Sequence, residues 1–125
     1  DVVIYLPEKN IMFSGDHIYV DRLLGVLPQS NATTWLDAFT KIESINPKVI
    51  VPGHGSVCNL PKAKNQTGDY LKFLVDGAKK YAEDMAGVEN AVKGLTSAPQ
   101  FEKLANFNEL HRGNISRTYL RLESQ

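Results

Sequence analysis

The chain has 125 residues, with 14 lysines and arginines against 14 aspartates and glutamates, so its formal net charge is zero. It is 42% hydrophobic, which is ordinary for a globular chain and argues against disorder. The neutral balance argues against a general nucleic-acid binder and against a polybasic membrane-surface protein. The single cysteine, Cys58, excludes an intrachain disulfide framework and a four-cysteine zinc site.

The first part of the chain predicts two strands of a sheet. Residues 2–6 are a continuous apolar run, which predicts a strand buried on both faces. Residues 11–14 predict a second short strand, closed by Gly15 and Asp16, and the two strands should form a hairpin. Residues 17–30 show no clear period, so we expect a long loop there.

A helix and a third strand should follow this loop. Ser30 or Asn31 can accept the free amides of the first helical turn, and Pro47 limits the length of the helix. Its apolar stripe recurs at helical spacing and consists of Trp35, Leu36, Phe39, Ile42 and Ile45. Residues 48–51 predict a strand that is stopped by the Pro-Gly pair at 52–53. This order predicts a β-α-β unit with parallel strands and a right-handed crossover.

The second half of the chain is expected to be helical. Pro61 can occupy the first position of a helix, and residues 88–95 are a short helical candidate. Gly87 closes an apolar stripe that consists of Tyr70, Leu71, Leu74, Val75, Ala78, Tyr81, Ala82 and Met85. A last helix is marked by Phe107, Leu110, Ile115, Tyr119 and Leu122. The basic residues typical of solvated helix faces are Lys79, Lys80, Arg112, Arg117 and Arg121.

These elements predict an α/β fold with strands first and helices after. We expect one unit over residues 1–125, with the strands and crossover helix in 1–60 and a helical tail in 61–125. No apolar run approaches the ~18–20 residues that a membrane-spanning helix needs.

Asp16 and His54 are the residues best suited to carry chemistry. Each follows a predicted buried strand, and His54 lies between two glycines that leave its imidazole unhindered. Ligands of open α/β sheets lie beyond the carboxyl ends of parallel strands, so these two side chains could meet at one rim of the sheet. A carboxylate and a neutral imidazole suit zinc, iron or manganese. Alternatively, both residues only form turns, since zinc normally takes at least three protein ligands.

The order of these motifs resembles the C-terminal half of a metallo-β-lactamase-superfamily hydrolase. The resemblance depends on the apolar strand, the F-S-G-D turn at 13–16, the helix with Trp35 and the V-P-G-H-G turn at 51–55. It implies the second half of a four-layer αββα sandwich. It also implies that Asp16 bridges two metal ions and that His54 binds the second, with zinc as cofactor and iron or manganese as alternatives.

The sequence also departs from that family. The H-x-H-x-D-H motif is absent, as is the histidine that precedes the Gly-Asp turn. His17 is not expected to replace them, because it directly follows Asp16 and its side chain starts toward the opposite side if the strand continues. His111 lies on or beside the stripe of the last helix, where a packed or solvated histidine is expected. Cys58 is expected to be a small buried residue. Arg22 lies in the loop after Asp16, where it could meet a substrate anion, and its position is the only support for this role.

Two functional hypotheses follow. In the first, the chain is a fragment of a metal-dependent hydrolase of the ester, thioester, lactam or phosphoester class that uses a metal-activated water. The parent enzyme would act on a small molecule, and this chain alone, with an incomplete metal site, would be inactive. The alternative is a non-catalytic interaction or structural module that retains the second half of the fold.

The expected partners follow from the same resemblance. Half of a sandwich leaves apolar sheet surface uncovered, so we expect as partner either a second copy, in a homodimer that rebuilds the sandwich, or the missing N-terminal half. Nucleic acid and membrane partners are not expected. We expect a soluble protein of bacterial type, in the cytoplasm or the periplasm.

Overall fold

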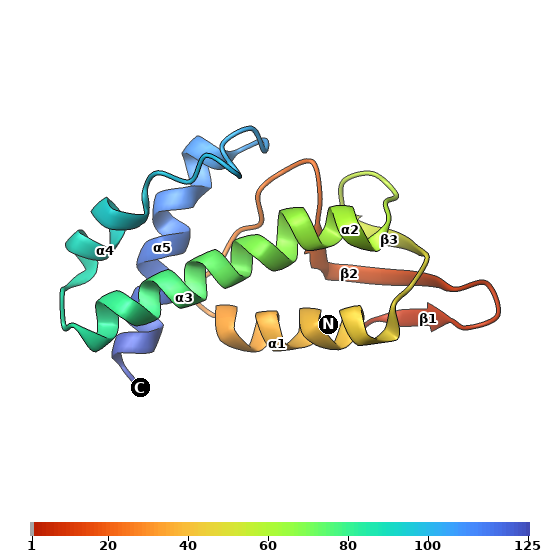
Figure 1. The fold of residues 1–125 in the computed structure, drawn as a ribbon, viewed down its shortest axis with the longest axis horizontal. Helices are drawn as coiled ribbons and strands as arrows, with labels where there is room; N and C mark the ends of the chain where they lie inside the picture. The colour runs from red at the N-terminus through yellow and green to blue at the C-terminus, as the bar shows by residue number, and fades with distance from the viewer. Residues whose placement is uncertain (1) are drawn as a thin grey trace.

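The computed structural model describes residues 2–125, and it confirms the predicted α/β class. A small sheet lies at one end of the molecule, and helices cover it and extend beyond it (Figure 1). The elements in chain order are β1 (Ile4–Leu6), β2 (Ile11–Tyr19), α1 (Ala32–Ile45), β3 (Val49–His54), α2 (Leu60–Ala63), the π-helix η1 (Lys64–Gly68), α3 (Asp69–Glu83), α4 (Val88–Leu95) and α5 (Phe107–Glu123). Within the described residues, no helix is long and apolar enough to cross a membrane.

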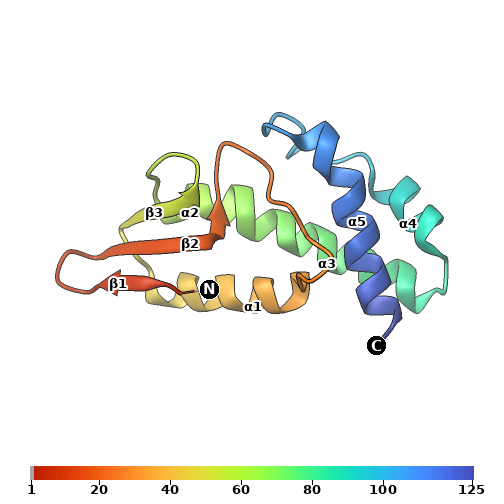
Figure 2. The same cartoon turned by 180° about the vertical axis from the view of Figure 1, so that it is seen from behind.

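The three strands have the order β1-β2-β3. β1 pairs with β2 in antiparallel orientation, and β2 pairs with β3 in parallel orientation with α1 between them in the chain. The predicted hairpin and the predicted β-α-β unit are therefore confirmed. Figure 2 shows α1 running alongside the strands that it connects.

The predicted end of the second strand at Gly15 and Asp16 is wrong. β2 continues through both residues to Tyr19, so the predicted loop of residues 17–30 begins later than expected. Gly15 has a φ of +54°, and the pairing register shifts on both sides of it. A glycine in this conformation makes a bulge without ending the strand, and the buried Ile18 holds the continuation against the core.

The predicted end of the third strand at Pro52 and Gly53 is also wrong, because β3 runs on to His54. β3 lies at an edge of the sheet, and an edge strand tolerates a proline whose missing N–H would point away from its neighbour. Both strands therefore carry Asp16 and His54 within their last residues.

The helices begin and end largely where the sequence predicts. Asn31, one of the two predicted caps, accepts hydrogen bonds from the backbone N–H groups of Thr33 and Thr34. Asn46 ends α1 in the left-handed conformation. The prediction is wrong for Met85, which follows the end of α3 and is 89% exposed instead of lying in the apolar stripe.

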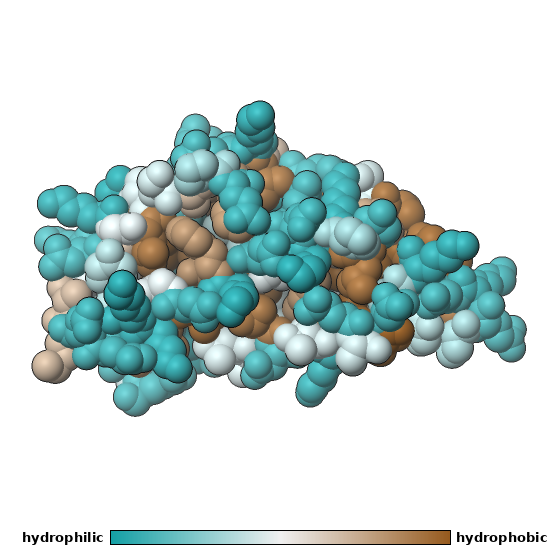
Figure 3. Space-filling view, viewed as in Figure 1, coloured by the Kyte–Doolittle hydropathy of each residue, from teal (hydrophilic) through white to brown (hydrophobic). Residues whose placement is uncertain are grey.

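One face of the sheet packs against helices, and the other face is open. Met12 and Ile50, which are neighbours across β2 and β3, are completely buried. The prediction that residues 2–6 are buried on both faces is wrong, because Ile4 is 55% and Leu6 40% exposed. The face in Figure 3 belongs to the helical side and is mainly hydrophilic, with hydrophobic patches between the charged side chains.

The open face carries two apolar rows that cross all three strands. The register aligns Ile4 with Phe13 and Val51 in the first row, and Leu6 with Ile11 and Val49 in the second. Facing residues on neighbouring strands project to the same side of a sheet. We call these six residues the apolar sheet face.

The buried interior consists of two hydrophobic clusters. The smaller one lies between the sheet and α1 and includes Met12, Phe39 and Ile50. The larger one joins the helices and the loop after β2, and it includes Leu24 and Tyr70. α3 contacts α1, α4 and α5, so it connects the sheet end of the molecule to the helical end (Figure 1).

Candidate metal centre

The structure brings Asp16 and His54 together. The Nε2 atom of His54 lies 3.2 Å from the Oδ1 atom of Asp16. The side chain of His54 is 37% exposed and that of Asp16 is 60% exposed, so both are accessible from solvent. They come from parallel neighbouring strands, near the carboxyl end of each, as the sequence predicted.

The irregular pairing of β2 and β3 creates this contact. Gly15 pairs with Pro52 and Tyr19 with His54, so three residues of β2 stand opposite one residue of β3. Asp16 lies in this bulged segment. A Cβ atom on Gly53 would lie 2.6 Å from the backbone of Gly15 and 2.8 Å from Oδ1 of Asp16. Glycine at 53 therefore allows β3 to approach the aspartate closely.

Aromatic rings fix the orientation of the imidazole. The ring of His54 stacks on the ring of Tyr19, with centroids 4.3 Å apart and planes 17° from parallel. Trp35 lies beside the same tyrosine at 6.0 Å, and the guanidinium of Arg22 lies 5.7 Å from the tyrosine ring centre. Burial and the nearby Asp16 raise the pKa of the Tyr19 phenol. Arg22 thus contacts an aromatic ring of this site, and Tyr19 is a site residue that the sequence analysis missed.

An exposed ion-pair cluster holds the loop that follows His54. Asp21 accepts hydrogen bonds from the backbone N–H and the hydroxyl of Ser56 at 2.9 and 2.7 Å. Lys62 lies 2.7 Å from the other carboxylate oxygen. The hydrogen bond from Lys62, followed by those from Ser56, lowers the pKa of Asp21 to about 2. The cluster ties the residues after β2 to those after β3.

The π-helix η1 also supports the end of β2. Thr67 is completely buried and hydrogen-bonds both polar backbone groups of Tyr19, and Gln66 accepts a hydrogen bond from the backbone N–H of Asp21 at 2.7 Å. π-helical turns are frequent at functional sites. No local pattern in the sequence predicts this element, because its role depends on a contact 48 residues away.

The remaining candidate residues do not join Asp16 and His54. Nδ1 of His17 lies 3.1 Å from the carbonyl oxygen of Ser14. His111 is packed, one of the two expected outcomes, and it is 1% exposed. Cys58 is half-buried beside Ile50, and burial raises the pKa of its thiol.

The donor pair fits part of a metal site. Carboxylate oxygen and imidazole nitrogen are the chemistry that zinc, iron and manganese accept. Across residues 2–125, no group of three or more His, Cys, Asp or Glu side chains is placed to hold a metal ion. Asp16 and His54 would therefore supply two ligands of a site that needs at least one more.

Comparison with known proteins supports the resemblance seen in the sequence. A search of curated proteins found no match to the chain. Residues 1–54 match the family model of the metallo-beta-lactamase superfamily, and this matched segment ends at the candidate ligand His54.

Proposed function

We propose that this chain is part of a metal-dependent hydrolase and that Asp16 and His54 belong to its metal site. The observation that carries the proposal is the 3.2 Å contact between these side chains at the carboxyl ends of two parallel strands. The family match over residues 1–54, which include both ligands, supports the same conclusion. The finer fold that we propose is the C-terminal half of an αββα sandwich, to which the apolar sheet face would contribute.

The proposed roles are those that the resemblance to the metallo-beta-lactamase superfamily implies. Asp16 would bridge two metal ions, and His54 would bind the second. When bound, zinc, iron or manganese lowers the pKa of a water and polarises a carbonyl or phosphoryl group. Tyr19 would hold the imidazole plane by stacking on it. Esters, thioesters, lactams and phosphoesters are the proposed substrate classes.

Two ligands do not complete such a centre, so we propose that this chain alone has no hydrolase activity. The remaining ligands would come from the other half of the fold.

The test is a zinc titration followed through the histidine side chains. The chain has three histidines, so ring ¹H–¹⁵N spectra report each of them separately. We expect Zn²⁺ to shift the His54 ring signals first. Asp16→Asn should weaken binding by about tenfold or more, since even the loss of a partner outside the ligand set costs about that much. The control His17→Gln should bind as the parent does. Unchanged His54 signals, or equal binding by Asp16→Asn, would overturn the proposal.

A second candidate function is an interaction module, and the apolar sheet face favours it. Ile4, Leu6 and Phe13 are 55%, 40% and 42% exposed although they are neighbours on one face. Contiguous apolar surface of this kind marks an association site. We propose a second copy of the chain as the occupant, with Asp16 and His54 then having no role in metal binding. Absence of metal binding together with self-association would favour this function over the first.

A further inference from the structure

A groove of about 430 Å³ lies between the C-terminal half of α5 and the loop after β2. α5 contributes Arg117, Leu120 and Arg121, and the loop contributes Pro28. Figure 2 shows this loop passing beside α5 before it reaches α1. The candidate metal ligands do not line the groove, so it is a second feature of the molecule, separate from the candidate metal centre.

Hydrogen bonds hold the two walls of the groove together. Nη1 of Arg117 donates to the carbonyl oxygen of Val26 at 3.0 Å, and the backbone N–H of Val26 donates to Oδ1 of Asn114 at 2.7 Å. The loop then closes a turn, in which the N–H of Ser30 donates to the carbonyl oxygen of Leu27 at 2.9 Å. A surface that is ordered before binding loses little entropy when a partner arrives. The groove is therefore formed in the free chain.

The groove carries positive charge without a negative counterpart. Arg117 and Arg121 line it, whereas no aspartate or glutamate of residues 2–125 does. The ion pairs of this described part of the chain use lysine or histidine as the cation, so neither guanidinium is paired with a carboxylate. Like charges four residues apart on a helix repel each other. A carboxylate bound between the two arginines would replace this repulsion by attraction.

An apolar surface lies beside the two charges. Leu120 is 48% exposed and lines the groove together with Pro28. Side chains three and four residues apart share one side of a helix, so Leu120 and Arg121 both lie one turn beyond Arg117. Arg121 is half-buried, and it also lines a narrow crevice between α5 and the start of α1. Its side chain is therefore already confined and loses little freedom on binding.

These properties fit an acidic peptide better than a lipid surface or a nucleic acid. A guanidinium binds a carboxylate through two parallel hydrogen bonds, and the leucine and proline offer contact to one apolar side chain. Lipid-binding clusters collect about four to eight lysines and arginines, which is more than this groove holds. The zero net charge of the chain is also unlike that of a nucleic-acid binder.

We propose that the groove between α5 and the loop after β2 docks an acidic peptide segment, with carboxylates on Arg117 and Arg121 and an apolar side chain on Leu120. This inference goes beyond the proposed function, because docking needs neither a metal ion nor the candidate ligands. The two can therefore fail separately.

The test is a fluorescence-anisotropy titration in a chelating buffer, which keeps metal ions from bridging the peptide to the protein. The probe is a fluorescein-labelled peptide of sequence Glu-Leu-Glu-Glu-Leu-Glu, and its control has glutamine at every glutamate. We expect saturable binding of the acidic probe with a dissociation constant below about 1 mM, and binding of the glutamine probe at least about fivefold weaker. Equal binding of the two probes, or no saturation by the acidic one, would overturn the proposal.

Two charge variants make the test specific to the groove. Arg121→Gln should weaken binding of the acidic probe by about fivefold, because it removes one guanidinium and leaves the contact between Arg117 and Val26 in place. Arg112→Gln is the matched control, since Arg112 is exposed on the same helix and does not line the groove. Circular dichroism would show that both variants are folded. Equal weakening by the two substitutions would reveal a general charge effect and contradict the proposed location.

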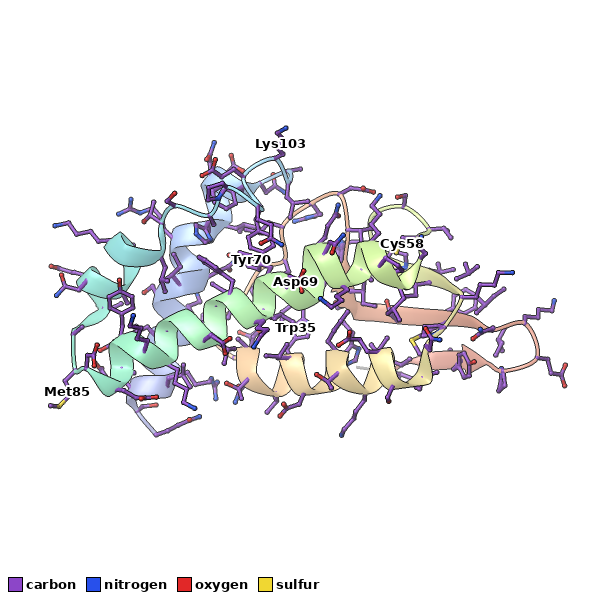
Figure 4. All side chains as sticks on the ribbon, viewed as in Figure 1. Trp35, Cys58, Asp69, Tyr70, Met85 and Lys103 are labelled. Atoms are coloured by element: carbon purple, nitrogen blue, oxygen red, sulfur yellow. The ribbon has the colours of Figure 1, made fainter. Side chains whose placement is uncertain are left out.

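A second pair of variants tests the apolar contact. Leu120→Ser should weaken binding of the acidic probe by about threefold, because it removes apolar surface that the peptide would cover. Met85→Ser is the control, since Met85 projects from the end of α3 and does not line the groove (Figure 4). An equal loss in both variants, or no loss in Leu120→Ser, would contradict the docking of an apolar side chain on Leu120.

The same variants separate a peptide from a lipid surface. Parent and Arg121→Gln would be sedimented with vesicles of phosphatidylcholine and phosphatidylserine. We expect no sedimentation of either protein. Sedimentation of the parent that Arg121→Gln abolishes, without binding of the acidic probe, would overturn the proposal and assign the groove to a membrane.

Discussion

Thr67 holds the backbone of Tyr19 at both of its polar groups. The N–H of Tyr19 donates to Oγ1 of Thr67 at 3.0 Å, and the hydroxyl donates back to the carbonyl of Tyr19 at 2.6 Å. The threonine side chain thus acts as a strand partner where β2 ends. Because Tyr19 also carries the stacked His54 ring, η1 positions the metal-ligand candidate through this contact.

Thr67→Val should destabilise the fold by about 1–3 kcal/mol, because it leaves a backbone donor and acceptor of Tyr19 without partners in a part-buried place. The measurement is urea unfolding followed by circular dichroism. Thr40→Val is the control, since its hydroxyl donates to the Leu36 carbonyl on an exposed helix face. If both variants lose the same stability, the contact with Tyr19 has no special role.

Gly53→Ala should displace Asp16 from His54. The added Cβ would lie 2.6 Å from the Gly15 backbone, and overpacking of this kind costs about 1–3 kcal/mol. Gly25→Ala is the control, because no heavy atom lies within 4 Å of the position that its Cβ would take. Histidine ring spectra should change for His54 in the first variant only. An unchanged spectrum for Gly53→Ala would contradict the expected displacement of Asp16 from His54.

Most elements of this fold could be predicted from local sequence. Helical periodicity found α1, α3, α4 and α5, and continuous apolar runs found the strands. The strand ends could not be found in this way, because Gly15 and Pro52 are usual strand breakers and only pairing with a neighbour shows that they are tolerated. The prediction for Met85 was wrong for a different reason. An apolar residue can have helical spacing and still lie beyond the last turn of the helix.

The sequence predicted that Asp16 and His54 come together, but it did not predict the residues that support them. Asp16 and His54 lie near the carboxyl ends of strands that a crossover helix joins, so the predicted topology brings them to one edge of the sheet, and the bulged pairing of β2 with β3 creates their contact. Thr67 and Asn114 act through contacts 48 and 88 residues away in the chain, and no local pattern encodes such distances. Arg117 is exposed, as expected for a solvated helix residue. Its guanidinium also donates a hydrogen bond to the carbonyl oxygen of Val26 in the loop after β2, which the sequence did not predict.

His111 should make stability depend on pH near neutrality. Nε2 donates to the Leu95 carbonyl and Nδ1 accepts from the Tyr70 hydroxyl, both at 2.8 Å. Burial lowers the pKa of His111 below its usual value, outweighing hydrogen bonds and Glu102, which raise it. The folded state therefore binds fewer protons than the unfolded state, so stability is complete above about pH 6.5 and falls as pH decreases below that value.

The check compares urea unfolding at two pH values on either side of this range. His111→Gln should lose less stability between pH about 7.5 and about 5 than the parent, since glutamine does not titrate there and can still donate to Leu95. His17→Gln, at a half-buried position, is the control. The same pH dependence in parent and His111→Gln would contradict this assignment.

The Asp21 carboxylate should titrate with a midpoint near 2, because hydrogen bonds from Lys62 and Ser56 stabilise its charged form. A lowered pKa stabilises the fold above the unfolded value of about 3.9, and this contribution is lost as pH falls from about 4 to about 2. Carboxyl ¹³C shifts measure the midpoint directly. Lys62→Met should raise it, whereas Lys72→Met, which removes the partner of Asp76, should leave it unchanged. If the Asp21 midpoint is the same in Lys62→Met as in the parent, a group other than Lys62 lowers the pKa of Asp21.

The apolar sheet face should mediate self-association of the chain. Phe13 lies at the centre of its first row, between Ile4 and Val51, and is 42% exposed. A glutamate at this position would be buried without a partner in a dimer, and an unpaired buried charge costs several kcal/mol, so Phe13→Glu should raise the dimer dissociation constant by about 100-fold or more. Leu120→Glu, at a similarly exposed site on α5, should not change it. Light scattering over a range of concentrations measures both. A parent that remains a monomer at every concentration would exclude a second copy as the occupant of this face, whereas a dimer that survives Phe13→Glu would place the interface elsewhere.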